Sequence, residues 1–473
     1  MVTLQESIQV ERSPAECFRY LQDFSTAEQW DPGVYRSAKL TPGPPRPGTA
    51  FDVLLDTPGK RMAMRYQLEE STPNERLVLT GWSSRVQARD TITLEPAGSG
   101  TRITYKAELE FSGAAGALEP TFKPGLKRMG RRAVNGLKQA LTIPETPDDF
   151  NWRDQVRYRT LLPAARDFTA HGYRTMPDKG LTEFMDEKTV AITGATSGLG
   201  LAAACELARL GARLVLIGRG EQRLTSAQEE IEAFSGCPAS TITTVEADLA
   251  LMANARAAGE QIRAQTANLD VLINNAGALF DEYAETAEGH ERALAIHLLA
   301  PWTLTRTLLP SLARGGGRVV NVASGGLYAQ GLHLDDLEFR NEPYDGTKAY
   351  ARAKRALVAV TEHWAEQHAD RNITFNSMHP GWAATPGVAR SLPPFNRRLL
   401  PWLRDARMGA DTMVWLASSR AVRHENGRFW FDRKPAPTAI FPGTRVTPEQ
   451  KETLVRQLEE LSGISSGKNE EVS

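Results

Sequence analysis

Two patterns of apolar and polar residues follow one another along this chain. Up to about residue 143, runs such as LQESIQVE, RMAMRYQLEE and TRITYKAELEF alternate apolar and polar residues as half-buried strands do, and TPGPPRPG, TPGK and EPAGSG mark turns. From about residue 188, continuous apolar runs such as KTVAITG, RLVLIG and LDVLINNAG alternate with helical patterns. That alternation is typical of a parallel sheet covered by helices on both faces. The sequence therefore predicts an α+β domain followed by a doubly wound α/β domain.

Changes in composition divide the 473 residues into four segments. Residues 1–143 form the predicted α+β domain. Residues 144–187 turn polar and proline-punctuated, which indicates a linker followed by a docking helix in VRYRTLLPAARDFTAHGY. Residues 188–440 hold the α/β pattern, and residues 441–473 predict a C-terminal helix with a disordered polar tail. Two domains also agree with a length that exceeds the usual size of one hydrophobic core.

The first domain resembles a known superfamily. Ser13 suits an N-cap and Pro14 a first helical position, and the basic amphipathic stretch GLKRMGRRAVNGLKQALT predicts a long closing helix. Together with SPAECFRYLQDFSTAEQWDPGV, this order of elements resembles the polyketide-cyclase/START-like superfamily. The resemblance implies a helix-grip fold with a cavity for an apolar, lipid-like ligand. Trp30, Phe51 and Trp82 are candidate lining residues, although aromatic residues at strand spacing more often belong to the core.

A glycine-rich turn opens the α/β domain. TGATSGLG directly follows its first apolar run and precedes a helical pattern, with Gly194, Gly198 and Gly200 in G-x-x-x-G-x-G spacing. Glycines there let the backbone turn sharply, approach a pyrophosphate and present free N–H groups at the positive end of a helix. A tight strand-to-helix connection explains such a turn equally well when it stands alone. Its place after an apolar strand favours nucleotide binding.

Four further motifs in the same order resemble the short-chain dehydrogenase/reductase family. They are VEADLA with Asp248, LDVLINNAG with Asn274 to Gly277, NVASGG with Ser324, and the Pro-Gly of MHPGWAATPG. The resemblance covers about residues 188–440 and implies a Rossmann domain, a nicotinamide cofactor and oxidoreduction of an alcohol or carbonyl. The candidate cofactor-binding residues are Gly194, Thr196, Ser197, Gly198, Leu199, Gly200, Arg219, Asp248, Leu249, Asn275, Ala276, Gly277, Tyr350, Lys354, Pro380, Gly381 and Thr385.

The second strand of this domain bears on the choice of nucleotide. RLVLIGRGEQRL ends in Gly218-Arg219, with no carboxylate where one would bind the ribose 2′-hydroxyl of NAD. The guanidinium of Arg219 would pair with a 2′-phosphate, so NADP is the expected cofactor and NAD the alternative. Arg223 is a weaker second candidate, and a solvated loop arginine is the competing explanation of Arg219.

The pattern Tyr-x-x-x-Lys occurs twice in YDGTKAYARAK, and a catalytic pair needs continuous helix between its members. Tyr344 is followed by the turn pair Asp345-Gly346, so its segment contains a helix start. Tyr350 and Lys354 lie inside a run without glycine or proline. We therefore assign Tyr350 as proton donor or acceptor and Lys354 as the cation that lowers the pKa of its phenol. Tyr344 is expected in a loop over the substrate cleft.

Two more residues complete the predicted catalytic group. Ser324 ends the fifth strand and would hold the substrate oxygen. The family has an asparagine in a kinked helix as the fourth member, and alignment of HLLAPW puts His297 in its place and Ala300 in place of a glycine. This departure raises the hypothesis that a proton relay survives through the main chain of His297. Within the family, VRYRTLLPAARDFTAHGY and HPGWAATPGVARSLP resemble a subgroup whose substrates are poorly defined.

Charge and cysteine content narrow the expected partners. A net charge of -1 gives no electrostatic reason to expect nucleic acid. Three cysteines without C-x-x-C spacing favour a reducing compartment and predict no metal site. Without a signal-like N-terminus or an apolar run of membrane-spanning length, a cytoplasmic protein is expected. A basic run could bind a membrane surface, but such a run is more often a solvated helix face; it comprises Lys127, Arg128, Arg131 and Arg132.

Two hypotheses about function follow. The first is an NADP-dependent oxidoreductase that acts on a small apolar carbonyl or alcohol, with the N-terminal domain binding a hydrophobic ligand. The second is a catalytically weak nucleotide- and lipid-binding or scaffolding protein, suggested by His297 and Ala300. The intact set of Ser324, Tyr350 and Lys354 favours the first. Members of the family commonly form oligomers, so a homo-oligomer is a further expectation.

Overall fold

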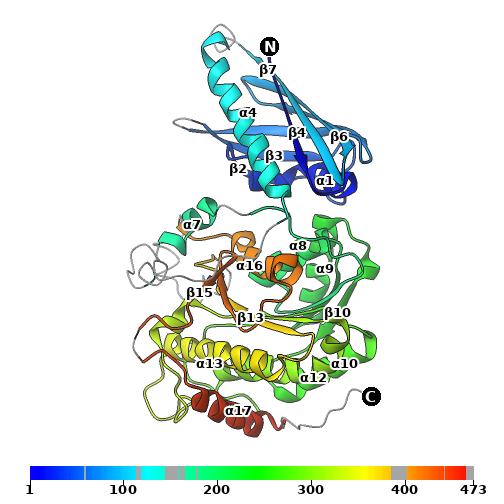
Figure 1. Cartoon of the computed structure of the whole chain (residues 1–473). Coiled ribbons are helices and arrows are strands. Elements are labelled where there is room, and N and C mark those ends of the chain that lie inside the picture. The colour runs from blue at the N-terminus through cyan, green and yellow to red at the C-terminus, as the bar shows by residue number, and fades with distance from the viewer. Residues whose placement is uncertain are drawn as a thin grey trace. The chain divides into compact units, whose positions relative to one another are not determined.

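The structure, a computed structural model, describes residues 1–57, 60–112, 119–143, 158, 166–176, 179–384, 402–441 and 443–464. Its chain forms two compact units (Figure 1). The N-terminal unit comprises Met1–Glu145 with Pro177–Thr182, and the second unit comprises Thr146–Met176 with Glu183–Ser473. The later segment that belongs to the N-terminal unit is joined to it by the backbone, since the Leu181 N–H donates to the Ala140 carbonyl over 2.9 Å. The predicted tail at 465–473 and most of the predicted linker lie outside the described residues.

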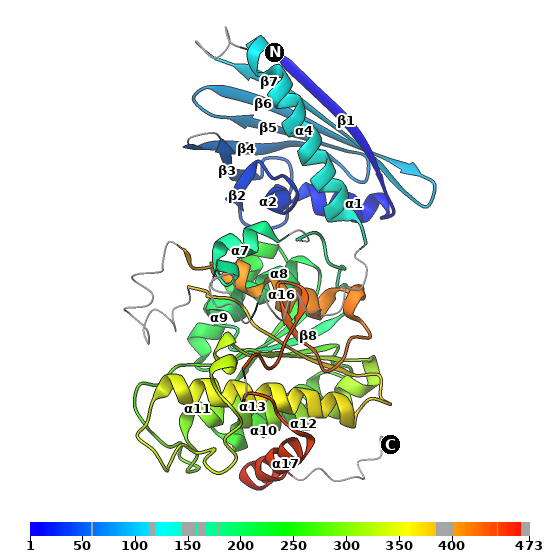
Figure 2. The same ribbon diagram turned by 60° about the vertical axis from the view of Figure 1, so that its left-hand side comes forward.

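The N-terminal unit is a seven-stranded antiparallel sheet in the order β1-β7-β6-β5-β4-β3-β2. Helix α4 (Glu119–Leu141) lies across it, as Figure 2 shows, and α1 (Pro14–Gln22) and α2 (Ala27–Trp30) follow the first strand. This is the arrangement of a helix-grip fold. The sequence predicted all strands except β2, a six-residue strand without regular alternation. The strands are β1 Val2–Val10, β2 Val34–Lys39, β3 Ala50–Thr57, β4 Lys60–Thr72, β5 Arg76–Trp82, β6 Val86–Ala97 and β7 Gly100–Phe111.

Local sequence explains how this unit closes. Ser13 and Glu16 form a capping box at the start of α1, which satisfies two free N–H groups of the first turn. Trp30 and Phe51 are buried in an aromatic core around Phe24, whereas Trp82 is 39% exposed. The core interpretation therefore holds for the first two and is wrong for Trp82, whose side chain is exposed.

The second unit is a doubly wound sheet with strand order β10-β9-β8-β11-β12-β13-β14-β15, parallel except for the last strand. Helices α8, α9 and α16 cover one face and α10, α12 and α13 the other (Figure 1). The strands are β8 Thr189–Thr193, β9 Arg213–Gly218, β10 Ile242–Glu246, β11 Val271–Asn274, β12 Arg318–Val322, β13 Thr374–Met378, β14 Phe429–Phe431 and β15 Lys434–Ala436. The helices are α7 Ala170–Thr175, α8 Gly198–Arg209, α9 Glu221–Ser235, α10 Met252–Gln265, α11 Arg292–Leu294, α12 Ala300–Gly315, α13 Gly346–Gln367, α16 Ala406–Ser418 and α17 Pro448–Ser462.

The core of the second unit lies between the sheet and the helices α12, α13 and α17. Trp302 of α12 stacks on Trp364 of α13 at 5.4 Å, and Leu454 and Leu458 of α17 pack into the same apolar cluster. The indole N–H of Trp302 donates to Ser462 Oγ over 3.1 Å. The predicted C-terminal helix is thus an integral layer of this unit, because it covers the outer face of α12 and α13.

Candidate active site

A cleft of about 1120 Å³ opens at the carboxyl ends of the parallel strands. It collects residues from the turns after β8, β9, β10, β11, β12 and β13 and from the start of α13. In doubly wound sheets this edge is where ligands bind, because the loops there diverge at the point where strand order reverses. Strand β8 has β9 on one side and β11 on the other, so the reversal lies at the glycine turn.

The glycine turn forms the floor of the cleft. Gly194 and Gly198 have positive φ angles of 67° and 57°, and a β-carbon on Gly200 would lie 2.3 Å from the Gly194 carbonyl oxygen. Ser197 at the start of α8 makes no side-chain cap hydrogen bond, so the first N–H groups of the helix stay available to an anion. Asn275 closes the turn from β11, since its amide donates to the Thr193 carbonyl over 2.9 Å. These residues fit a dinucleotide pyrophosphate.

Arg219 and Asp248 lie at the far end of the same cleft. Arg219 is 62% exposed, and its guanidinium is 3.9 Å from the Asp248 carboxylate. That separation exceeds a hydrogen bond, so the pair is a weak, solvated one. Arg223 lines the same wall. The guanidinium groups of Arg219 and Arg223 therefore both line the cleft at the carboxyl end of β9.

Ser324, Tyr350 and Lys354 come together at the other end. Asp345 caps α13 by accepting from the N–H groups of Thr347 and Lys348, and the helix then carries Tyr350 and Lys354 one turn apart. The phenol of Tyr350 is hydrogen-bonded to Ser324, which follows β12. Lys354 Nζ donates to the Val322 carbonyl over 2.6 Å and lies 5.9 Å from the Tyr350 ring centroid. The helix start at Gly346 agrees with the prediction that only the second Tyr-x-x-x-Lys pair is helical.

The expected lowering of the tyrosine pKa is not found. Burial raises the pKa of Tyr350, and the hydrogen bond from Ser324 opposes that shift only in part. Burial also lowers the pKa of Lys354 from 10.5 to about 7. The physical cause is the same for both groups: each is desolvated, so each pKa shifts in the direction that favours the neutral form, and the ammonium that would stabilise a phenolate is itself disfavoured.

His297 lies against this group from a distorted helix. Residues Ala295–Leu299 form a π-helical turn between α11 and α12, and His297 in it is fully buried. Its ring meets the Tyr350 ring edge to face at 4.9 Å, and its Nε2–H donates to the Ala278 carbonyl over 2.7 Å. Burial and the nearby Lys354 hold the pKa of His297 well below 6.5. The imidazole is therefore neutral, with a buried Nδ1 that has no partner among the described residues.

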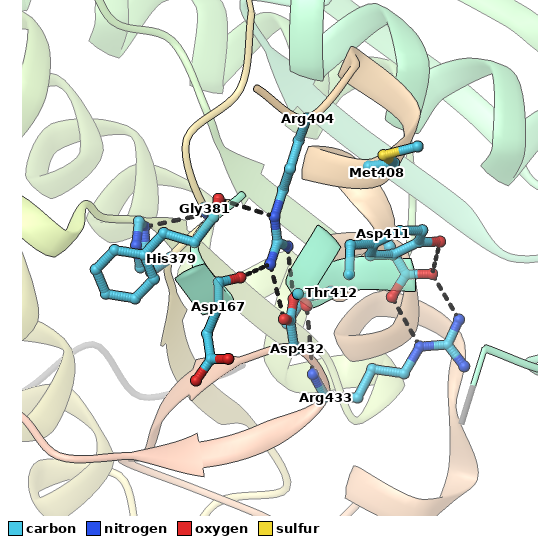
Figure 3. Close-up of polar contacts among 12 residues, drawn as sticks. Asp167, His379, Gly381, Arg404, Met408, Asp411, Thr412, Asp432 and Arg433 are labelled. Atoms are coloured by element: carbon cyan, nitrogen blue, oxygen red, sulfur yellow. Dashed lines mark hydrogen bonds and ion pairs between the residues drawn. The ribbon is translucent and has the colours of Figure 1, made fainter. Parts of the chain in front are cut away.

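The wall after β13 is supported by the segment in which the sequence predicted a docking helix, observed as α7 at Ala170–Thr175. Arg404 is buried and forms a two-pronged ion pair with Asp432 at 2.6 and 2.7 Å, as Figure 3 shows. Its guanidinium also donates to the carbonyls of Asp167 and Phe168. The Phe168 ring packs at 4.6 Å on the ring of His379, which lines the cleft. The segment before α7 thus supports the loop that carries Pro380 and Gly381.

Tyr344 does not line the cleft. Its hydroxyl donates to Glu291 over 2.9 Å, and its ring packs on Phe339 and Tyr283. Tyr344 lies in the loop before α13, as expected, but its phenol turns into a side cluster because it binds Glu291, which also caps α11.

Most candidate residues converge on the cleft. Gly200 stands behind the floor of the turn and does not line it, and Thr385 lies outside the described residues. Four residues that line the cleft were missed by sequence reasoning: Phe280, Arg292, His379 and Trp382. His379 could have been found, because it directly precedes the predicted Pro380 and Gly381. The candidates that line the cleft are Gly194, Thr196, Ser197, Gly198, Leu199, Arg219, Asp248, Leu249, Asn275, Ala276, Gly277, His297, Ser324, Tyr350, Lys354, Pro380 and Gly381.

Comparisons with known proteins place this architecture in a class of oxidoreductases. A model described as short chain dehydrogenase matches residues 188–393, and one for polyketide cyclase / dehydrase and lipid transport matches residues 1–142. Dehydrogenase/reductase SDR family member 12 of Bos taurus is 38% identical over 305 residues, which cover 63% of this chain and 94% of that protein. The chain belongs to the short-chain dehydrogenase/reductase family and carries an N-terminal domain of the polyketide-cyclase type.

Further relatives share the second unit. The Homo sapiens protein with the same name as the bovine relative is 37% identical over 304 residues, covering 63% of this chain and 94% of that protein. Retinol dehydrogenase 14 of Mus musculus is 32% identical over 321 residues, covering 64% of this chain and 93% of that protein. The subgroup resemblance predicted from the sequence is thus confirmed. Within the described part of the chain, no helix combines the length and apolarity needed to span a membrane.

Proposed function

We propose that this oxidoreductase prefers NADP and transfers hydride to or from a small apolar carbonyl or alcohol, with Tyr350 as acid and base. The observation that carries the proposal is that Ser324, Tyr350 and Lys354 meet in one cleft with a glycine turn able to hold a dinucleotide. A bound dihydronicotinamide would supply the hydride. Residues 188–440 would form the catalytic domain and residues 1–143 the ligand domain.

Four residues of the chain would carry the other steps of the reaction. The Ser324 hydroxyl would donate to the substrate oxygen and stabilise its developing charge. Tyr350 would pass its phenolic proton to that oxygen in reduction and take it back in oxidation. Lys354 lies 5.9 Å from the Tyr350 ring, close enough to support that proton transfer once a bound anionic group restores its charge. Neutral His297 would act as an orienting group beside Tyr350, with the main chain of its π-helical turn carrying the relay.

The two exposed guanidinium groups near β9 support NADP. A 2′-phosphate would pair with Arg219 more strongly than Asp248 does at 3.9 Å, since charge-assisted pairs to phosphate are short and two-pronged. In Arg219→Ala, we expect the Kd for NADPH to rise by about 10–100-fold, with the Kd for NADH changed little. Fluorescence titration with both nucleotides measures this, and Arg314→Ala, which removes an arginine that does not line the cleft, is the control. Equal effects on NADPH and NADH would contradict the NADP preference.

A turnover screen tests the oxidoreductase proposal itself. Oxidation of NADPH is followed with sterol, retinoid and fatty-aldehyde carbonyls, in the wild type and in Tyr350→Phe. Turnover that the substitution abolishes supports the proposal. Tight NADPH binding with no turnover that depends on Tyr350 would favour the alternative, a nucleotide- and lipid-binding or scaffolding protein.

The N-terminal unit is proposed to hold a hydrophobic ligand. Support comes from the polyketide cyclase / dehydrase and lipid transport model over residues 1–142 and from the aromatic interior around Phe24 and Trp30. Mass spectrometry of solvent extracts from the purified full chain tests it, with Tyr350→Phe protein as a reference that leaves the N-terminal unit intact. The basic residues Lys127, Arg128, Arg131 and Arg132 are all exposed on α4, as a solvated face would be.

A further inference from the structure

Three strands of the N-terminal unit direct one polar cluster into its interior. Asp90 on β6 is 3% exposed and is hydrogen-bonded by the phenols of Tyr66 on β4 and Tyr105 on β7. Strand β5 stands between β4 and β6, with Gly81 opposite Tyr66 and Leu79 opposite Asp90. A β-carbon on Gly81 would lie 2.5 Å from the Tyr66 ring. The ring can therefore cross β5 to reach Asp90 only because position 81 is glycine.

Helix α2 covers this cluster with two more polar groups. Trp30, its last residue, is 3% exposed and packs edge to face on Tyr105 at 6.0 Å. Its indole N–H has no hydrogen-bond partner among the described residues. Asp31 follows, with the Gly33 N–H as a donor to its carboxylate over 2.8 Å. An unpaired buried donor costs about 1–3 kcal/mol and a buried carboxylate without a cation costs more, so the fold gains no stability from this arrangement.

The charges around Asp90 indicate which form of the carboxyl is present. Burial raises its pKa to about 7 and that of Asp31 to about 6, and the other groups that act on Asp90 are the phenols of Tyr66 and Tyr105. In the described part of the chain no lysine, arginine or histidine acts on it, and the one further group that does is the carboxyl of Asp31. Near neutral pH the acid is therefore substantially protonated and can donate a hydrogen bond. A neutral buried carboxylic acid beside a tyrosine is a known way to hold a carbonyl oxygen.

We propose that Asp90, Tyr66, Tyr105 and Trp30 form the polar recognition point of an internal site that takes a neutral apolar molecule through one carbonyl oxygen. The donors to the ligand are the acid proton of Asp90 and the unpaired indole N–H of Trp30, while the phenols of Tyr66 and Tyr105 donate to Asp90 and hold it in place. The surrounding rings, including Phe24 against Trp30 and Tyr66, supply apolar contact. This inference rests on the proposed ligand-binding role of the N-terminal unit and names the chemistry of its ligand.

The test uses the full chain and the probe prodan, a neutral fluorescent naphthyl ketone whose emission shifts to the red when its carbonyl accepts a hydrogen bond. NADP⁺, which cannot reduce the ketone, is present at saturation, and Tyr350→Phe must bind the probe as the wild type does, which separates this site from the cleft. In the wild type, we expect the Kd for prodan to rise about tenfold or more between about pH 6 and about pH 8.5, because Asp90 loses its proton. Asp90→Asn keeps a donor that does not titrate, so its binding should be independent of pH.

Two substitutions test the indole donor and one of the two phenols that hold Asp90. Trp30→Phe and Tyr105→Phe keep the rings and should each weaken prodan binding by about 3–10-fold with a smaller red shift. Tyr35→Phe, on β2 beneath Arg61, is the matched control and should bind as the wild type does. Wild-type affinity in the first two variants, a pH profile in Asp90→Asn equal to that of the wild type, or no prodan binding would overturn the inference. Tighter binding of 2-naphthylmethylamine with rising pH would overturn it as well, since that result assigns the site to cations.

Discussion

Each unit of the chain buries one ionisable group whose pKa moves to about 7, and the two groups move in opposite directions. In the N-terminal unit the pKa of Asp90 rises from 3.8, and in the second unit the pKa of Lys354 falls from 10.5. Burial is the largest cause of both shifts, since a low-dielectric interior disfavours charge of either sign. The difference lies in the surroundings: the described groups that act on Asp90 are two phenols and the carboxyl of Asp31, whereas Lys354 lines an open cleft suited to an anionic cofactor.

The comparison implies two kinds of site. In the cleft, bound anionic groups can restore the charge of Lys354, so its lowered pKa describes the ligand-free state. In the N-terminal interior, a neutral ligand leaves Asp90 protonated. The two proposals thus assign to the second unit chemistry that uses a charge, and to the N-terminal unit recognition without one.

The largest expected effect removes the chemistry of the second unit alone. Tyr350→Phe deletes the phenol that is bonded to Ser324, and kcat should fall by about 10²–10⁴-fold with little change in the Kd for NADPH. Steady-state kinetics on the best carbonyl from the screen measures this. Tyr344→Phe is the matched control from the other Tyr-x-x-x-Lys pair and should keep near wild-type kcat, because Tyr344 bonds Glu291 away from the cleft. An equal loss in both variants would remove Tyr350 from its assigned role.

A substitution at Arg404 should destabilise the second unit without affecting the N-terminal unit. Arg404→Met removes the ion pair to Asp432 and the donors to the Asp167 and Phe168 carbonyls, leaving a buried carboxylate unpaired. We expect a loss of about 3–5 kcal/mol in the stability of the second unit. Hydrogen exchange measured by mass spectrometry reads each unit separately and should show faster exchange around Phe168 and His379, with the N-terminal unit unchanged. Arg340→Met, at an exposed ion pair, is the control and should cost far less.

The sequence predicted the parts of these sites that lie close together along the chain. The glycine turn, the helix start at Asp345-Gly346 and the helix of Tyr350 and Lys354 each follow from local propensity and spacing. The wall of Phe168, His379 and Arg404 could not be predicted in this way, because its members come from segments more than 200 residues apart that meet only after folding. The same holds for Tyr66, Asp90 and Tyr105, which meet through strand register and through a glycine on the strand between two of them.

The pH dependence of stability should have opposite signs in the two units. The raised pKa of Asp90 means that the N-terminal unit loses stability as pH rises from about 4 to about 7, on the order of 2–4 kcal/mol, and Asp90→Asn should reduce that slope to the part that Asp31 contributes below about pH 6. The lowered pKa of Lys354 means that the second unit gains stability as pH rises from about 7 toward about 10, and Lys354→Met should remove that gain. Urea unfolding followed by hydrogen exchange in each unit measures both slopes. Slopes of the same sign in the two units would contradict the assignment.

The smallest expected effect comes from replacing one glycine by alanine in each unit, in two separate variants. Gly200→Ala would place a β-carbon 2.3 Å from the backbone oxygen of Gly194, so α8 must shift away from the turn. We expect a loss of about 1–3 kcal/mol in the second unit together with weaker NADPH binding. Gly125→Ala on α4 meets nothing within 4 Å and should leave stability unchanged or raise it by up to about 1 kcal/mol, because alanine favours helix. Thermal unfolding and NADPH titration of the two variants measure the contrast. NADPH affinity equal to that of the wild type in Gly200→Ala would mean that close packing of α8 on the turn does not shape the cofactor floor.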